Sequence, residues 1–501
     1  MKFLNTTKFL KFLFFYLFFW ANCSDTNNIS LTPTPTFTPS ATLTPAATPV
    51  SSGNIYYVSP SGKDSNPGTI TEPWATPGYA SKQLQPGDTL IIMDGEYIMS
   101  TFYDDMITPL VDGTSTKWIT IKGEDGARPL LRGKSSLLAV VDISGRSYIK
   151  IENLKITSEI DTPYSGGLRE GIEAGGSGGG NVSNIIIKNV EIYDVEEAGI
   201  NLSGNTQNIT MDSLNIHHTG MGGISAPSAE GGKGWENVAL KNSYIRYAGY
   251  FYQGKEQISP YDRPDGIGME AGEGPLEISN CTFEHNRGDG VDSKLKNTYV
   301  HNTIIANNSA DSLKLWGPNS KVENVLIYGD GDGNAQNGPW ASIVINTELS
   351  GNFEFINVTV DENSSRENYP ILIQYDSSTP ITVLMRNCIV AHGYSEIYMG
   401  NSVMATFDHN LFYRSGEPDE PVLHFNGNDY LPSQLNALGE GNISEEPLFV
   451  KRAWGSSGDY HLKINSPAIN SGTAKGAPTI DLEGNTRPQG SGYDIGAYEH
   501  I

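Results

Sequence analysis

A short acidic pattern occurs three times in the middle of the chain. It reads Asp265-Gly-Ile-Gly-Met-Glu270, then Asp289-Gly-Val-Asp-Ser-Lys294, then Asp311-Ser-Leu-Lys-Leu-Trp316. The first residues of successive copies lie 24 and 22 residues apart. Self-similarity at a period of roughly 20 to 50 residues is typical of solenoids, in which each copy forms one turn of a coil. The period therefore predicts stacked parallel strands before any local propensity is considered.

Stacking of these strands would place equivalent positions roughly 4.8 Å apart, in columns that run along the coil. The columns are Asp265 with Asp289 and Asp311, Gly268 with Asp292 and Lys314, and Glu270 with Lys294 and Trp316. The apolar residues Ile267, Val291 and Leu313 should point into the coil, which turns the second and third columns outward. Like charges opposite one another on neighbouring strands repel, so the acidic column predicts a bound cation.

A second repeated feature is a polar residue, usually Asn, at the end of successive apolar strands. Asn tolerates the left-handed backbone of a bend, and its amide can bond to the copy one turn away. We therefore interpret these residues as a structural ladder and not as a catalytic set. The positions are Asn153, Asn189, Ser213, Asn242, Asn280, Asn302, Asn324, Asn357, Asn387 and Asn410. The shortest steps, from Asn280 to Asn302 and on to Asn324, predict a minimal coil of 22 residues.

The acidic column is interrupted towards the N-terminus. There the equivalent places are taken by Glu170-Gly-Ile-Glu173, Ala198-Gly-Ile-Asn201 and Gly222-Gly-Ile-Ser225. Carboxylates are therefore expected to concentrate on the turns that begin at Asp265, Asp289 and Asp311.

Both ends of the folded part resemble secreted right-handed parallel β-helix proteins. The start, Asn54-Ile-Tyr-Tyr-Val-Ser-Pro-Ser-Gly-Lys-Asp64, resembles their first strand and implies a capping helix, expected over Tyr79 to Leu84. The predicted fold is all-β, a right-handed parallel β-helix (solenoid) over residues 54–420 with an N-terminal cap, because an open coil end exposes strand edges and core. Residues 421–501 resemble a tail common to such proteins, and we expect them to pack on the β-helix as a structural segment.

The N-terminus has the features of an export signal. A lysine-bearing start precedes an apolar stretch from Phe12 to Ala21, which is short for a membrane span. The stretch ends at Trp20-Ala-Asn-Cys23, which resembles a bacterial lipoprotein cleavage box, so residues 1–23 are interpreted as a signal peptide with Cys23 as the lipidated residue. Residues 24–53 are a Thr/Pro-rich linker that cannot bury a core.

Charge and cysteine content limit the partners. The formal net charge of −24 argues against nucleic acid as a partner, and an anionic substrate would need a local cation to be held. Cys281 and Cys388 follow ladder residues of two repeats, so we expect buried stacking thiols and not a disulfide. The expectation is an extracellular or cell-surface monomer, with a lipid on Cys23 as its membrane anchor.

The three acidic turns resemble the family-nine pectate lyases, which are calcium-dependent polysaccharide lyases on a right-handed parallel β-helix. The matching residues are Asp265-Gly-Ile, Gly288-Asp-Gly-Val-Asp292 and Ser312-Leu-Lys-Leu315, with Gly288 in the place of the first Asp of a paired motif. The resemblance implies Ca²⁺ ligands at Asp265, Asp289 and Asp292 and a general base at Lys314. Asp311 or a loop residue is the expected substitute for the ligand missing at Gly288.

A weaker resemblance links Lys294-Leu-Lys-Asn297-Thr-Tyr-Val-His-Asn302 to the alginate lyase and chondroitinase B family. It implies that Lys294 is the base. We prefer Lys314, because it stacks beyond Asp292, whereas Lys294 lies two residues farther along its strand, roughly 6 to 7 Å away. Glu270 and Trp316 are candidate substrate contacts beside these lysines.

The predicted function is a calcium-dependent lyase that cleaves uronic-acid-containing, pectate-like polymers by β-elimination. Oxygen-only ligands suit calcium, and a cation would neutralise the substrate carboxylate. Two alternatives remain open: a glycoside hydrolase that uses the carboxylates of Asp265, Asp289 and Asp311, and a non-catalytic glycan-binding surface protein. The sequence leaves open whether the polymer is pectate, alginate or a glycosaminoglycan.

Overall fold

A computed structural model describes residues 53–175, 181–202, 205–226, 234–251, 257–258, 264–329, 331, 341–362, 369–415 and 419–501. The expected signal peptide, Cys23 and all but the last residue of the linker lie outside these ranges. None of the helices in the described ranges is long and apolar enough to cross a membrane.

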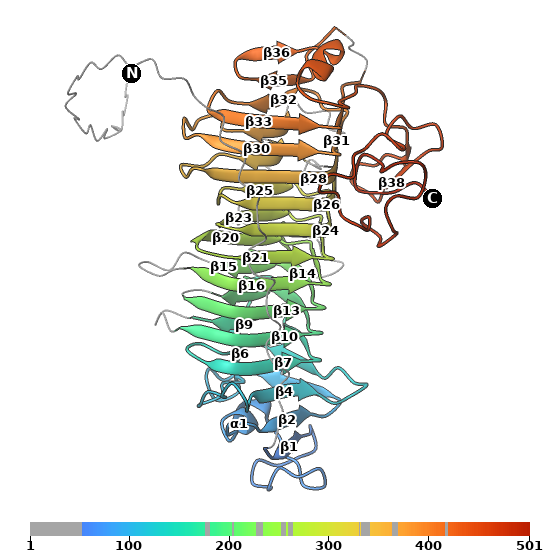
Figure 1. Cartoon of the computed structure of the whole chain (residues 1–501). Coiled ribbons are helices and arrows are strands. Elements are labelled where there is room, and N and C mark those ends of the chain that lie inside the picture. The colour runs from blue at the N-terminus through green and yellow to red at the C-terminus, as the bar shows by residue number, and fades with distance from the viewer. Residues whose placement is uncertain are drawn as a thin grey trace, which may run out of the picture. The chain divides into compact units, whose positions relative to one another are not determined.

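The folded part is a right-handed parallel β-helix, as predicted (Figure 1). One face of the coil is a sheet in which all pairings are parallel except that of its last strand, β36. Its strands are β6 (Leu137–Asp142), β9 (Leu168–Ala174), β12 (Ile200–Leu202), β15 (Ile224–Ala226), β20 (Ile267–Gly272), β23 (Val291–Leu295), β25 (Leu313–Leu315), β27 (Ala341–Ile345), β29 (Tyr369–Ile373), β32 (Ile397–Met399), β35 (Leu423–Phe425) and β36 (Asn428–Tyr430).

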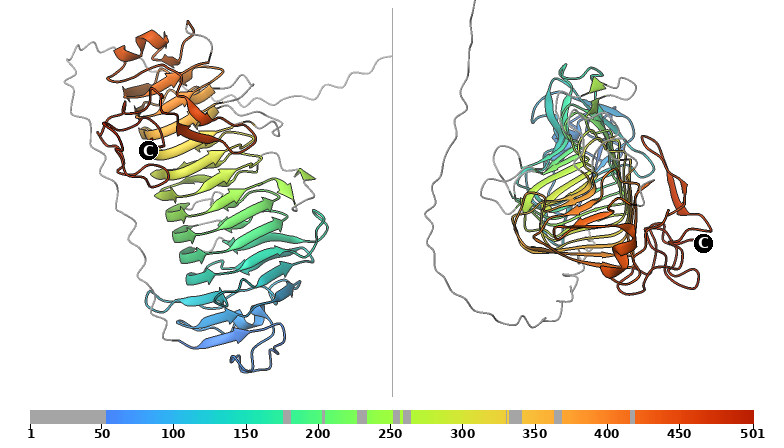
Figure 2. Two further views of the ribbon diagram at one scale, coloured as in Figure 1. Left: turned by 90° about the vertical axis from the view of Figure 1, so that its right-hand side faces the viewer. Right: turned by 90° about the horizontal axis from the view of Figure 1, so that it is seen from above.

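The remaining coil strands form a second, larger sheet that covers two faces, because strands such as β24 pair on both sides of a bend, with β21 and with β22. Viewed along the stack, successive coils lie over one another (Figure 2). The strands are β1 (Ile55–Val58), β2 (Thr89–Ile92), β3 (Glu96–Met99), β4 (Ile119–Gly123), β5 (Leu130–Gly133), β7 (Ser147–Glu152), β8 (Lys155–Ser158), β10 (Val182–Lys188), β11 (Glu191–Val195), β13 (Thr206–Asp212), β14 (Asn215–Thr219), β16 (Trp235–Lys241), β17 (Tyr244–Arg246), β21 (Leu276–Ser279), β22 (Thr282–Glu284), β24 (Thr298–Ala306), β26 (Ser320–Tyr328), β28 (Gly351–Asp361), β30 (Ile381–Arg386), β31 (Ile389–Ala391), β33 (Val403–Asp408) and β34 (Leu411–Tyr413). Two short antiparallel pairs lie outside the coil: β18 (Tyr250–Phe251) with β19 (Gln257–Ile258), and β37 (Phe449–Lys451) with β38 (Asp459–Leu462).

The core of the coil is built from inward-pointing columns of apolar side chains. Ile267 pairs with Val291 and Val291 with Leu313, and all three side chains are completely buried. The same column continues in both directions through Ile172, Ile200, Ile224, Ile343 and Ile371. This confirms the predicted alternation, and it fixes which residues of these strands face outward.

The Asn ladder is confirmed, with one error in register. All the predicted positions except Asn410 have a φ between 47° and 58°. Stacked amides bond directly, for example Asn189 Nδ2 to Asn153 Oδ1 at 2.8 Å. At the last position the left-handed residue is His409, because Arg386 pairs with Asp408 and so places His409 in the ladder. Asn410 is buried one residue later, and its Oδ1 accepts a bond from the Cys388 N–H.

The capping helix is shorter and earlier than predicted. Helix α1 covers Pro77–Ser81, beginning at a proline, which suits the first turn of a helix. The prediction of Tyr79 to Leu84 was wrong because the N–H groups of Lys82 and Gln83 bond to residues only three positions back, which tightens the chain and ends the helix. Leu84 nevertheless remains buried and completes the end of the core.

Part of the C-terminal segment packs on the outside of the coil. Tyr460, Leu462 and Tyr498 form an apolar cluster with Leu326 and Tyr328 of the coil. The coil itself extends past residue 420, since β35 pairs with β32, and a short 3-10 helix at Pro432–Ala437 follows it. Cys281 and Cys388 are buried free thiols, as expected.

Candidate active site

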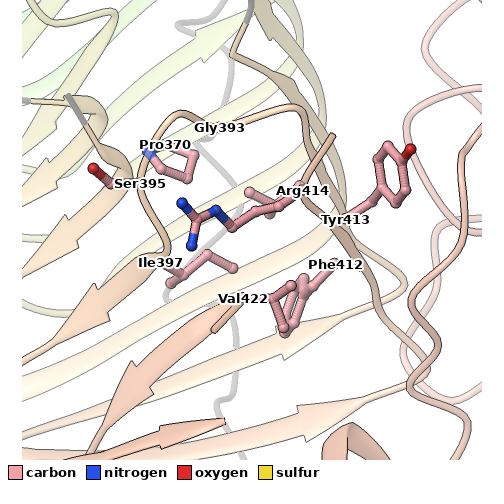
Figure 3. A pocket seen from close by; sticks show the side chains of 9 residues that line it. Pro370, Gly393, Ser395, Ile397, Phe412, Tyr413, Arg414 and Val422 are labelled. Atoms are coloured by element: carbon pink, nitrogen blue, oxygen red, sulfur yellow. The ribbon is translucent and has the colours of Figure 1, made fainter. Parts of the chain in front are cut away.

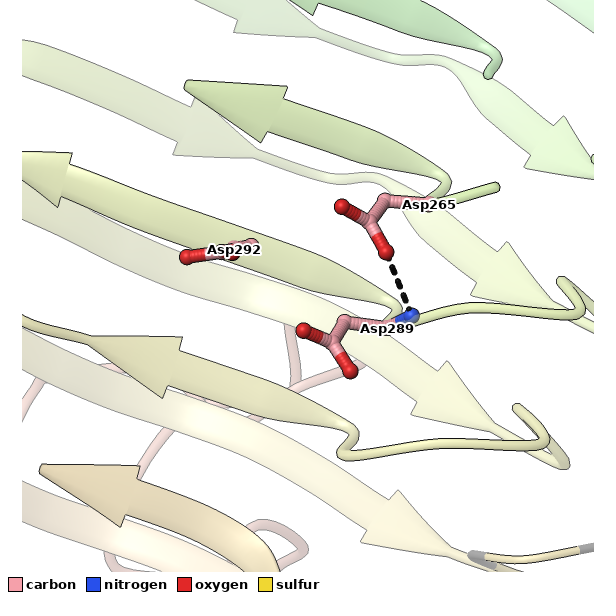
Figure 4. Close-up of side chains that lie close together, drawn as sticks. All are labelled: Asp265, Asp289 and Asp292. Carbon is pink, nitrogen blue, oxygen red and sulfur yellow. Dashed lines mark hydrogen bonds between the residues drawn. The ribbon is translucent and has the colours of Figure 1, made fainter. Parts of the chain in front are cut away.

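The candidate site lies on the twelve-stranded sheet, where the chain enters β20, β23 and β25. The turns are stacked by backbone bonds, and each acidic side chain is tied to the next coil (Figure 4). The Asp289 N–H donates to Asp265 Oδ1 at 2.8 Å, and the Asp311 N–H donates to Asp289 Oδ1 at 2.9 Å. The acidic column is therefore real, and backbone donors hold its carboxylates in place.

Asp265, Asp289 and Asp292 each offer a carboxylate oxygen within 4.8 Å of the others. Asp289 and Asp292 are buried and Asp265 is partly exposed. Burial, reinforced by the two neighbouring carboxylates, raises the pKa of Asp265 well above its usual range. Burial also raises the pKa of Asp292, and the positive charge of Lys314 offsets this only in part. Three carboxylates this close need positive charge to be ionised together.

Lys314 supplies some of that charge. Its Nζ forms an ion pair with Asp289 and lies 3.5 Å from Asp311 and 3.7 Å from Asp292. Burial by itself would lower the pKa of Lys314, but the three carboxylates together outweigh burial and raise it. Lys314 pairs with Asp292 across the strands as predicted, yet its side chain turns into the carboxylates and is only 7% exposed.

Lys294 lies closer to the carboxylates than its position on the strand suggested. Its Nζ is 2.9 Å from Glu270 Oε1 and 3.4 Å from Asp292 Oδ2. The prediction of a 6 to 7 Å separation was wrong because it counted strand positions and ignored the reach of a four-carbon side chain. Burial by itself would lower the pKa of Lys294, but the carboxylates of Asp292 and Glu270 outweigh burial and raise the pKa above its usual value. Distance to Asp292 therefore does not separate the two lysines.

The third predicted column is only partly formed. The register of β20 with β23 shifts after Met269, so Glu270 and Lys294 meet through their side chains and are not paired across the two strands. Trp316 follows the end of β25, and its backbone N–H donates to Ser293 O. Asp311 is completely buried, its Oδ1 accepts a bond from the Ala341 N–H, and it is not one of the three carboxylates grouped closely enough to share a cation.

A groove of about 560 Å³ runs along this sheet from β9 to β23. Asp265, Glu270, Asp292 and Lys294 line one end of it, whereas Lys314 and Trp316 are not among its lining residues. Its other polar lining residues are Glu170, Glu197, Asn201 and Ser225. The length of the groove suits an extended chain better than a small compact ligand.

A second, much smaller cavity of about 10 Å³ lies between Ile397, Phe412 and Arg414 (Figure 3). It has room for about one water molecule. We do not consider it a substrate site.

Sequence reasoning did not recognise a second pair of carboxylates, one of which lines the groove. Glu170 and Glu173 are both buried, and Glu170 Oε1 accepts a bond from Asn201 Nδ2 at 3.0 Å. Burial and a hydrogen bond to Glu173 raise the pKa of Glu170 to about 10. The signal was present in the sequence, because Glu170-Gly-Ile-Glu173 has the same spacing of acids as Asp289-Gly-Val-Asp292.

The structure thus combines a right-handed parallel β-helix with clustered carboxylates and lysines beside a groove. Residues 56–338 match the family described as Pel9A-like, right handed beta helix region. This match spans more than half of the chain, and the protein belongs to that family.

The chain is also similar to individual proteins. The uncharacterized protein YwoF of Bacillus subtilis (strain 168) is 23% identical over 484 residues, which cover 83% of this chain and 92% of that protein. The crystal structure of pectate lyase Pel9A is 16% identical, with a TM-score of 0.49 over 90% of this chain and 98% of that chain. The complex structure of XylC with xylose is 11% identical, with a TM-score of 0.52 over 89% of this chain and 99% of that chain.

Proposed function

We propose that this protein is an exported, calcium-dependent polysaccharide lyase that cleaves uronic-acid-containing polymers by β-elimination. The observation that carries the proposal is the cluster of Asp265, Asp289 and Asp292 at one end of the groove. Lysine ammonium groups form ion pairs with its carboxylates. Elimination at a uronate removes the proton at C5, next to the carboxylate, and expels the oxygen at C4. The reaction needs positive charge at the carboxylate and a base for the proton, and residues for both lie here.

The residues of the cluster fit a calcium ion. All the donor atoms are carboxylate oxygens, which calcium prefers to nitrogen or sulfur. Asp292 Oδ1 is buried and has no hydrogen-bond partner among the described residues, so it can accept a cation. Gly268 leaves room for the Asp265 carboxylate, because a Cβ at this position would lie 2.9 Å from Asp265 Oδ2. A bound calcium would supply positive charge that neutralises the substrate carboxylate and the charge that develops on it.

Lys314 is our choice for the residue that accepts the C5 proton. It touches two of the three candidate ligands, and the negative charge of these carboxylates is what keeps it protonated. Neutralisation of Asp289 and Asp292 by a cation would remove much of that effect. Lys294, which lines the groove, is assigned to hold the substrate carboxylate.

The experiment that tests this function incubates the exported protein with pectate, alginate and a glycosaminoglycan, with calcium or with a chelator. A lyase releases an unsaturated sugar, which absorbs in the ultraviolet, together with new reducing ends. We expect absorbance on at least one polymer with calcium and none with the chelator. New reducing ends without absorbance would mean a glycoside hydrolase, and polymer binding without either signal would mean a glycan-binding protein.

The place of action is proposed from the N-terminal sequence, with a lipid on Cys23 as a membrane anchor. A Cys23→Ser variant should move the protein from the membrane fraction to the medium. The wild-type protein would be found in the medium to the same extent if Cys23 carried no lipid.

A further inference from the structure

We propose that Glu170, Glu173 and Asn201 form a second divalent-cation site at the far end of the same groove, separate from the cluster at Asp265, Asp289 and Asp292. Calcium is the cation that these oxygen donors fit best.

The register of the sheet makes the second site a structural copy of the first. Ile172 of β9 stacks through Ile200 and Ile224 onto Ile267, the residue at the same position in β20. Counting back two residues along each strand places Glu170 in the column of Asp265 and Asp289. Glu173 pairs with Asn201, in the column that continues to Asp292 and Lys314. Glu170 and Glu173 therefore occupy the positions that Asp289 and Asp292 occupy in the first site.

The two sites differ in what neutralises them. Asp292 is followed in its column by Lys314, whereas Glu173 is followed by Asn201, which carries no charge. The nearby guanidinium of Arg169 is engaged by Glu197, at 2.7 and 3.1 Å. In the described part of the chain, no lysine or arginine forms an ion pair with Glu170.

The buried oxygens point to a ligand. Glu170 is only 5% exposed and its carboxyl contacts that of Glu173, but its Oε2 receives no hydrogen bond from an amide, alcohol or ammonium group of the described residues. The Oδ1 of Asn201 is likewise buried without a hydrogen-bond partner among the described residues, while the Nδ2 of Asn201 donates a hydrogen bond to Glu170 Oε1. Buried oxygens without donors are costly in a folded protein unless something binds them. Two carboxylates in contact, one of them bonded to the Asn201 amide, need a cation more than they need a further acceptor.

The position in the groove suggests what the second cation does. Glu170 and Asn201 line the groove that also contains Asp265 and Asp292. Three strand steps separate β9 from β20, which corresponds to roughly 14 Å. If the protein acts on polyuronates as proposed above, the second cation would hold another carboxylate of the same polymer chain, away from the bond that is cleaved.

The test is a count of calcium ions bound per chain, by equilibrium dialysis of the whole exported protein. We expect two ions in the wild type, one in Glu170→Gln, one in Asp289→Asn and none in the double variant. Glu197→Gln is the matched control, because Glu197 lines the same groove but is paired with Arg169, and it should retain two. If Glu170→Gln does not fold, Asn201→Asp provides the second variant, and its added carboxylate should tighten one of the two binding steps.

The count separates this inference from the proposed function. A wild type that binds one ion, lost in Asp289→Asn and kept in Glu170→Gln, would overturn the second site and leave the lyase proposal intact. One ion lost in Glu170→Gln and kept in Asp289→Asn would support the second site and contradict the proposed catalytic calcium. No calcium bound to the wild type would overturn both.

Discussion

The ammonium group of Lys314 forms an ion pair with the carboxylate of Asp289, and both side chains are more than nine-tenths buried. A buried pair of this kind stabilises only as long as both charges are present, because a single buried charge is strongly unfavourable. The pair therefore links the stability of the coil to the charge of the candidate active site.

Replacing Lys314 by Met should destabilise the protein when calcium is absent. The substitution leaves Asp289 and Asp311 buried beside one another without their cation, and breaking such a pair costs about 3–5 kcal/mol. Denaturant unfolding in a chelator measures the loss, and added calcium should recover part of it. Lys296→Met is the control, since the exposed pair of Lys296 with Glu273 should contribute less than about 1 kcal/mol. Equal losses in the two variants would contradict the buried-pair argument.

Asp289→Asn should abolish the stabilisation by calcium that depends on the first site, while the coil stays folded. The amide keeps an oxygen that can accept the Asp311 N–H, so the backbone ladder is preserved. Ligand binding at 100 times the dissociation constant stabilises a protein by about 2.7 kcal/mol, and a melting scan with and without calcium measures this shift. An undiminished shift in Asp289→Asn would exclude Asp289 as a ligand. Glu273→Gln, at an exposed carboxylate outside the groove lining, provides the control.

The C-terminal segment should lose a little stability with rising pH, because His461 bonds to other residues of that segment. Burial lowers the pKa of His461, but hydrogen bonds to Asp459 and Glu483 outweigh it and raise the pKa above 6.5. A group whose pKa is raised on folding contributes stability that is complete below its unfolded pKa and is lost as pH rises through the folded pKa. Since the side chain is 38% exposed, the contribution should be below about 1 kcal/mol. Unfolding midpoints between pH 6 and 9 should fall less in His461→Gln than in the wild type. Parallel pH profiles of the two proteins would show that His461 contributes no pH-dependent stability.

Much of this structure follows from the repeat period. The columns through Asp289 and Asp292 and the inward apolar residues were predictable, because a two-residue alternation and a fixed coil length determine which positions stack. The left-handed Asn positions were predictable for the same reason, although His409 took the place expected for Asn410.

What the repeat could not reveal is where long side chains go. Lys314 turns into the carboxylates and Lys294 reaches Asp292, because side-chain torsions and not strand positions decide these contacts. The register shift after Met269 was also hidden, because the extra residue falls near the end of β20, where too little of the alternation remains to reveal it. The pairing of Glu170 with Glu173 was visible in the sequence, but without the groove there was no reason to consider it a site.

The two lysines should have different kinetic effects. If Lys314 accepts the C5 proton, Lys314→Ala should lower kcat by about 10²–10⁴-fold with calcium binding intact. Lys294→Ala should mainly raise KM, because it would remove a contact made equally in the ground state and the transition state. Initial rates over a range of polymer concentrations separate the two effects. The reverse pattern would transfer the base to Lys294, which lies on the groove.

The most direct test of the central claim is the mass of the oligosaccharides released from a uronate polymer by the wild-type protein. Elimination breaks the C4–oxygen bond without adding water. Each product with a new non-reducing end is therefore lighter by one water than the corresponding hydrolysis product. Mass spectrometry of a digest made with calcium should show the lighter products, and the same digest with a chelator should show none. Products of the full, hydrated mass would contradict the account and identify the protein as a glycoside hydrolase.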